Sequence, residues 1–322
     1  MRQEWIDRPE GGTAFGYKLI TGFALAFGRT AARIALYPIT LYFLIRRGPE
    51  RRASREYLRQ ITGRKASLWQ VAKHIYCFAA VTLDRVFLLS ESFKRFDVRT
   101  FGLDQLRKAW AQGRGVLLLG SHLGSFDALR VLADFRSDIK LRVVIDIEQN
   151  RRLSEVLNAL NPQLAQSVIN ARQEGTTTAL IIKEALDERS LVTLLADRAR
   201  PGNQVMTADF LGRPAPFPTA PWQLAAALKV PVVLCFGLYR GGNRYDLHFE
   251  AFADQLKLER AQREAELQQT IQRFADRVAH HARSAPYNWF NFYDFWRADD
   301  SQIAPTADAD AAGPDPGRGA RR

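Results

Sequence analysis

Short apolar runs recur through the middle of the chain. They occur at Val116–Leu119, Leu141–Ile145, Val168–Ile169 and Leu191–Ala196. Apolar runs of this length, bounded by glycine or polar residues, are typical of strands that are buried on both faces. Segments with helical spacing follow two of them, at Asn150–Leu160 and Thr176–Arg189. This alternation predicts an α/β fold with a mainly parallel central sheet flanked by helices.

Further elements are predicted on both sides of this region. Ahead of the first strand, the spacing predicts helices at Ala66–Leu89 and Gly102–Gln112. Behind the last, it predicts a helix at Pro218–Leu228, strands at Pro231–Tyr239 and Tyr245–Phe252, and a long amphipathic helix at Leu258–Arg283. Gly241 and Gly242 favour a hairpin turn between the two strands.

The N-terminal stretch Thr13–Ile45 is rich in apolar residues but is interrupted by Lys18, Arg29 and Arg33. On a helix these cations form one narrow stripe, a pattern typical of helices that lie in a membrane interface. The alternative is a helix packed on the domain core with its stripe facing water. We favour the membrane, with in-plane contact preferred over spanning, and expect Pro38 to kink the helix.

A basic segment follows directly, at Arg46–Lys65, with eight cations against two glutamates. A solvated basic helix would explain it, but its position next to the apolar stretch favours binding to anionic headgroups. The whole chain of 322 residues has a net charge of +12. No nucleic-acid-binding motif accompanies this charge, so an anionic membrane and an acidic protein are the favoured partners, and nucleic acid is not.

The spacing of cysteine and histidine argues against a metal or disulfide framework. The chain has two cysteines, Cys77 and Cys235, both among apolar residues, and only His280 and His281 adjoin. We therefore predict no metal and no bound cofactor.

The first strand leads into the chemistry-bearing residues His122 and Asp127. Open α/β sheets place their sites outside the carboxyl ends of strands. A neutral histidine there can remove a proton from an alcohol or amine, and a carboxylate can fix its tautomer. On a regular helix the two would point apart, so Gly124 and Ser125 must break it, with Ser125 capping a helix at Ala128–Phe135. Without the strand and the break, a backbone-bonded histidine and a helix-start acid would be the simpler reading.

A different chemistry is suggested by the glycines and serines of the same stretch. Gly120–Gly124 has the outline of the hydrolase nucleophile elbow, but His122 stands at its centre instead of serine. A lipid hydrolase that uses Ser121 or Ser125 is therefore the weakest of the alternatives.

The H-x4-D pattern after an apolar strand resembles the lysophospholipid acyltransferase superfamily, in the bacterial branch that includes the lipid A lauroyl/myristoyl acyltransferases. A second block supports the resemblance: LVTLLAD at Leu191–Asp197, then Phe210-Leu211-Gly212 and Pro218-Thr219-Ala220. The resemblance spans about Arg99–Trp296. It implies transfer of a fatty acyl chain from a thioester to a lipid, with His122 and Asp127 as the catalytic pair.

The resemblance also places Asp197 and the residue after it in the substrate pocket. Arg198 and Arg200 are expected to bind a phosphate of donor or acceptor, although a loop salt bridge would equally explain them. Gly124 and Ser125 are expected to contact substrate from the other strand end. Backbone N–H groups at Gly120–Gly124, or Arg198, would stabilise the oxyanion.

These expectations combine into one hypothesis for the whole chain. Residues 1–65 form a membrane-associating helix and basic segment, residues 66–297 the acyltransferase domain and residues 298–322 a disordered tail. The protein is expected to be a lipid O- or N-acyltransferase that uses acyl carrier protein or acyl-coenzyme A. It would act at the cytoplasmic face of the bacterial inner membrane, peripherally or anchored by its first helix. The alternative from another class is a non-catalytic protein that binds anionic lipid.

Overall fold

The computed structural model describes residues 14–88, 95–130, 140–147, 167–171, 175–199 and 202–296, with side chains described from residue 20 onward. The predicted helix at Asn150–Leu160, the tail at 298–322 and Arg200 lie outside these ranges. Everything that follows concerns the described residues.

Seven strands of the described chain form one sheet in the order β1-β9-β8-β2-β5-β3-β4. Their bounds are β1 Asp97–Phe101, β2 Val116–Gly120, β3 Leu141–Ile145, β4 Val168–Asn170, β5 Leu191–Leu195, β8 Val232–Gly241 and β9 Arg244–Ala253. All neighbours pair in parallel except β8 and β9, which form a hairpin. The predicted mainly parallel sheet is confirmed. Strand β1 was missed because none of its five residues is buried, so it has no continuous apolar run.

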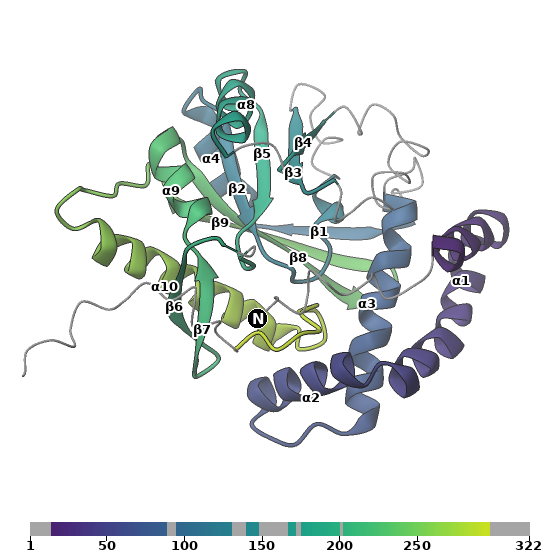
Figure 1. Ribbon diagram of the computed structural model, residues 1–322. Coiled ribbons are helices and arrows are strands. Elements are labelled where there is room, and N and C mark those ends of the chain that lie inside the picture. Colours follow the sequence, from purple (N-terminus) through teal and green to yellow (C-terminus); the bar gives the residue numbers. More distant parts are fainter. Residues whose placement is uncertain are drawn as a thin grey trace, which may run out of the picture.

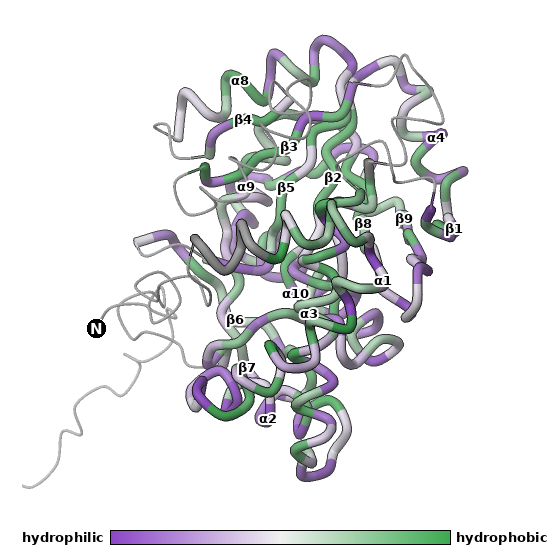
Figure 2. Tube along the Cα trace, turned by 90° about the vertical axis from the view of Figure 1, so that its right-hand side faces the viewer, coloured by the Kyte–Doolittle hydropathy of each residue, from purple (hydrophilic) through white to green (hydrophobic). Residues whose placement is uncertain are grey.

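Helices cover both faces of this sheet (Figure 1). One face carries α8 (Gly175–Asp187), α9 (Ala220–Leu228) and α10 (Arg263–Ser284). The other carries α1 (Ala14–Arg46), α3 (Leu68–Leu88) and α4 (Leu103–Ala111). Strand β2 serves both cores, because Leu117 and Leu119 pack with the first set and Val116 and Leu118 with the second. Figure 2 shows hydrophobic residues concentrated in the strands at the centre of the molecule.

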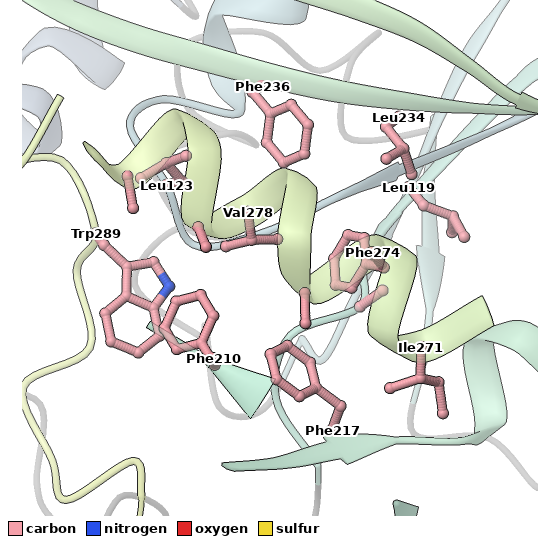
Figure 3. Close-up of a cluster of buried hydrophobic side chains, with 14 of the residues drawn as sticks. Leu119, Leu123, Phe210, Phe217, Leu234, Phe236, Ile271, Phe274, Val278 and Trp289 are labelled. Carbon is pink, nitrogen blue, oxygen red and sulfur yellow. The ribbon is translucent and has the colours of Figure 1, made fainter. Parts of the chain in front are cut away.

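A separate two-stranded ribbon, β6 (Val205–Phe210) and β7 (Arg213–Pro218), lies beside α10. The sequence did not predict it, because prolines at 214, 216 and 218 argue against a strand. They alternate along β7, so all three sit at equivalent register positions. In a ribbon of two strands every second N–H position of each strand has no partner strand to bond, so prolines, which have no N–H, are tolerated there. Phe210 and Phe217 then carry the ribbon into the core of Figure 3, against Phe274 of α10.

Two arginines of the cationic stripe, Arg29 and Arg33, face the protein. Arg29 and Arg33 each contact the carboxylate of Asp84 in α3 at 2.7 Å, and the Tyr245 hydroxyl donates to the same carboxylate at 2.9 Å. The predicted orientation of the stripe toward lipid headgroups or water is therefore wrong for these two arginines. The reason is that the partner carboxylate belongs to another helix, 51 residues further along the chain. The Lys18 side chain lies outside the described side chains.

Large apolar side chains consequently occupy the outer surface of α1 and the start of α3. We call this set the N-terminal apolar face; it comprises Leu25, Phe27, Ile34, Tyr37, Leu41, Tyr42, Ile45, Leu68 and Trp69, all exposed by half or more. Helix α2 (Gly48–Thr62) connects α1 to α3 along the chain and packs against α3. It carries most of the basic segment. Non-helical backbone occurs in α1 at Gly28, where φ is 81°, ahead of Pro38. None of the helices described is long and apolar enough to cross a membrane.

Candidate active site

Two neighbouring parallel strands deliver the central residues of the site. In β2 and β5, Gly120 pairs with Leu195, so the residues two positions beyond each are His122 and Asp197. The strands run in the same direction and are in register, so both side chains emerge at the carboxyl edge of the sheet. This edge is the place where the sequence predicted the site.

His122 and Asp197 form a close pair. The imidazole Nδ1 lies 2.8 Å from Asp197 Oδ1, and the backbone N–H of His122 donates to Oδ2 at 3.0 Å. The Asp197 side chain is fully buried, whereas 31% of the His122 side chain is exposed. An ionised carboxylate accepts only, so Nδ1 carries the proton and Nε2 keeps its lone pair. Among the described residues, nothing is bonded to Nε2.

Asp127 has a different partner from the one the sequence predicted. Its carboxylate accepts a hydrogen bond of 2.7 Å from Arg85 Nε in α3, and the expected bond to His122 is not formed. Asp127 begins a short 3-10 helix, η2 (Asp127–Arg130). The turn at Gly124, where φ is 73°, sends the chain away from His122 before this helix starts. The Ser125 hydroxyl caps nothing among the described residues, so its predicted role as a helix cap is also wrong.

The turn after His122 is packed directly onto β8. A Cβ at Gly124 would lie 1.9 Å from the carbonyl oxygen of Gly237, and a Cβ at Gly237 would lie 2.1 Å from that of Ser125. Glycine is required at both positions for this close approach. The N–H groups of Gly124 and Ser125 donate to Asn288 O and Gly237 O. Their predicted contact with substrate is therefore not made through these N–H groups.

A C-terminal aromatic segment, residues 287–296, packs against the loop that carries His122. Its Phe290 N–H donates to the carbonyl of His122 at 2.9 Å, and Trp289 pairs with Leu123 in an isolated bridge. Trp289 is buried against Phe210 (Figure 3). It also contacts Phe295. The segment therefore holds the histidine loop, and its Asn288 side chain is also bonded to the backbone of Tyr239 in β8.

Arg198 lies beside the pair and is held by this segment. Its Nε donates to Asn291 Oδ1 at 2.5 Å and its Nη2 to Phe290 O at 2.8 Å, and the guanidinium lies 5.5 Å from the centre of the Tyr293 ring. Its Nη1 makes none of these bonds. Arg198 is thus a fixed cation with one donor group to spare.

The surroundings set the protonation of both members of the pair. Burial and the nearby charge of Arg198 lower the pKa of His122, and Asp197 opposes them only in part. Burial by itself would raise the pKa of Asp197, but the imidazole and the cation outweigh burial and lower it. The site therefore holds a neutral imidazole and an ionised carboxylate at neutral pH, which is the state of a general base and its orienter.

Other chemistries find less support in the same loop. The Ser121 and Ser125 hydroxyls are buried and make no hydrogen bond with His122. A serine nucleophile needs that bond for its activation. Within the described part of the chain, no cluster of three or more histidine, cysteine, aspartate or glutamate side chains is arranged to hold a metal ion.

Fold and site together define a class: an α/β protein with a histidine–carboxylate pair at the carboxyl edge of a mostly parallel sheet. A sequence comparison with known protein families matches residues 71–298 to the bacterial lipid A biosynthesis acyltransferase family. The matched residues include the whole site. The chain belongs to this family, and the resemblance noted in the sequence is confirmed. No curated protein matches the chain at a significant level. Family membership supports an acyltransferase that acts on a lipid.

Proposed function

We propose that the protein transfers a fatty acyl chain from an acyl thioester to a hydroxyl or amine of a lipid, with His122 as general base and Asp197 as its orienter. The observation that carries this proposal is the bond from His122 Nδ1 to Asp197, which leaves a partly exposed Nε2 with a free lone pair. Nε2 takes the proton of the acceptor while the acceptor oxygen or nitrogen attacks the thioester carbonyl carbon. The C–S bond then breaks, and the imidazolium returns the proton to the departing thiolate.

Arg198 is the group that we propose for the oxyanion. The attacked carbonyl oxygen becomes negatively charged, and fixed donors aimed at it lower the barrier. The backbone N–H groups of His122, Gly124 and Ser125 already donate to protein acceptors. Arg198 is held through Nε and Nη2, so Nη1 can serve the oxyanion without any rearrangement.

The charge of the chain supports our proposal for the acyl donor. The net charge of +12 suits an acidic carrier protein as the source of the acyl chain, with acyl-coenzyme A as the alternative. The reaction itself draws only on side chains of the site, so we propose no bound cofactor and no metal. The acceptor is a lipid, and we place the enzyme at the cytoplasmic face of the bacterial inner membrane.

Contact with the membrane is proposed through the N-terminal apolar face. Trp69 is 76% exposed and Phe27 68%, far more than an ordinary core-facing helix would leave open. Exposed cations of the basic segment flank this face, among them Arg46, Arg52 and Lys65. Apolar contact beside positive charge suits an anionic bilayer, with the helices lying in its surface.

Single-turnover transfer from radiolabelled acyl carrier protein and acyl-coenzyme A, with a total lipid extract as acceptor, tests the reaction. We expect a labelled lipid from wild type and none from His122→Ala, whose circular dichroism should match wild type. Wild-type rates from a folded His122→Ala protein would refute the mechanism. No labelled lipid from either protein, combined with undiminished vesicle binding, would favour the lipid-binding alternative.

Flotation with vesicles that contain 30% phosphatidylglycerol tests the membrane face. We expect Phe27→Glu combined with Trp69→Glu to abolish co-flotation, and Leu180→Glu, an exposed apolar residue on α8, to leave it intact. If the double variant co-floats as well as Leu180→Glu does, membrane contact must be made by another surface.

A further inference from the structure

We propose that Asp127 is a positioning residue that acts through Arg85 and does not orient the His122 ring. The assignment of the ring's partner rests on geometry alone, whereas its effect on turnover rests on the proposed function. Asp127 stands at the position where the H-x4-D pattern puts the carboxylate of the catalytic pair, so the inference changes the role of that residue.

The ion pair joins the histidine loop to a rigid helix. Arg85 Nε lies 2.7 Å from Asp127 Oδ2, with 29% and 14% of the two side chains exposed. The preceding residue of α3, Asp84, is fully buried and is bound by Arg29 and Arg33 of α1. Because Asp84 fixes this turn of α3, Arg85 presents its guanidinium from a firm support. Asp127 therefore anchors the start of η2 to α3, five positions beyond His122.

Backbone hydrogen bonds to neighbouring elements hold the near half of the loop, whereas Ala128 and Leu129 of η2 are held by apolar packing. Gly124 and Ser125 are bonded to Asn288 and to β8, and His122 to Phe290. The Arg85–Asp127 pair adds an ionic restraint to this packing, between the start of η2 and α3. With both halves fixed, the imidazole keeps the direction in which Asp197 holds it.

The pair also shapes the field at the imidazole. The charge of Arg85 contributes to lowering the pKa of His122. Asp127 offsets part of that charge at short range, so the loss of the carboxylate strengthens the effect of Arg85 and should lower the pKa of His122 further. Asp127 thus reaches His122 by two routes, through the loop and through Arg85, and both pass through the same ion pair.

Steady-state kinetics of single and double variants test the proposal. We expect Asp127→Asn and Arg85→Met each to lower kcat by about 10- to 100-fold, the range for a displaced catalytic group, with the donor KM unchanged. The double variant should be no slower than the slower single variant, because both remove one interaction. Arg85→Lys and Asp127→Glu keep the charges and should recover most of the rate. A full rate in Arg85→Met beside a loss of about 1000-fold or more in Asp127→Asn would overturn the proposal.

A second measurement decides the ring's partner without any turnover. The chain has five histidines, so ¹⁵N-labelled imidazole signals can be assigned to His122 with a His122→Gln variant. We expect Asp127→Asn to keep the Nδ1–H tautomer of His122 and Asp197→Asn to change it. A change of tautomer in Asp127→Asn but not in Asp197→Asn would refute the proposal even if the acyl transfer itself were confirmed. If no transfer is found, the tautomer still tests the geometry, and the two failures are distinguishable.

Discussion

Asp84 and Asp197 are two comparable carboxylates of this protein. Both are completely buried and both are bound by basic groups, but they differ in whether a bound group is open to a ligand. Asp84 receives two arginines and a tyrosine hydroxyl, and each of these groups is held in the packing between α1, α3 and β9. Asp197 receives one imidazole and one backbone N–H, and that imidazole is partly exposed.

The difference separates a structural charge from a chemical one. At Asp84 the partners form a closed network, so the carboxylate joins two helices and offers nothing to a ligand. At Asp197 the carboxylate holds the inner nitrogen of a ring whose outer nitrogen is open. Burial strengthens both interactions. Only the Asp197 interaction acts on a group that can react, which is the exposed Nε2 of His122.

The largest effect is expected from Asp197→Asn. An amide has one oxygen where the carboxylate has two, so it cannot accept both from Nδ1 and from the backbone N–H of His122. An amide NH₂ facing Nδ1 would select the tautomer with the proton on Nε2, which cannot act as base. We expect kcat to fall on the order of 10³- to 10⁴-fold, or about 4–5 kcal/mol, with the melting temperature little changed.

His122→Ala supplies the matched comparison for that variant. If Asp197 acts only through the imidazole, the double variant should be as slow as His122→Ala alone. Independent, additive losses would show that Asp197 has a role of its own and would weaken the contrast with Asp84.

The second effect concerns stability and is expected from Asp84→Asn. Removing the charge leaves Arg29 and Arg33 without their partner in the interior, which is costly by about 3–5 kcal/mol of unfolding free energy. Asp97→Asn is the control, because its ion pair with Arg99 is exposed and is worth at most about 1 kcal/mol. Urea denaturation of the three proteins measures both values. A loss at Asp84 no larger than at Asp97 would show that the buried network is not a structural anchor.

The sequence predicted much of this fold because the sheet is buried on both faces. Strands such as β2 and β5 must be continuously apolar there, and their runs were visible in the chain. Because these runs also show where each strand ends, the position of His122 at the carboxyl end of β2 could be predicted as well. The ribbon β6–β7 gave no such signal, since neither its prolines nor its half-exposed pattern resembles a buried strand.

The partner of the histidine was harder to predict. Asp127 is near His122 in the chain, whereas Asp197 is 75 residues away and is brought close only by the register of β2 and β5. The same holds for α1, whose cations find a carboxylate from another helix instead of solvent. Local spacing predicts which groups share a face, but pairing across the sheet decides which groups meet.

The smallest effect concerns the pH dependence of the reaction. The base must be neutral, so activity is lost as the pH falls through the pKa of His122. Because that pKa lies below the ordinary value of 6.5, kcat/KM should still exceed half of its plateau at pH 6.5 and fall about tenfold per unit at lower pH. Arg198 contributes to the lowering, so Arg198→Gln should move the acid limb to higher pH by less than about one unit.

Arg198→Lys is the control that keeps the charge but not the geometry. Both variants lose hydrogen bonds to Asn291 and Phe290, and both should lose turnover if Nη1 serves the oxyanion. Only Arg198→Gln should shift the acid limb, because only it removes the positive charge beside the imidazole. An equal shift in both would trace the change to altered packing of the C-terminal segment. No shift in either would mean that Arg198 does not contribute to the pKa of His122. The contrast with Asp84 would then rest on the exposure of the imidazole and not on the cation beside it.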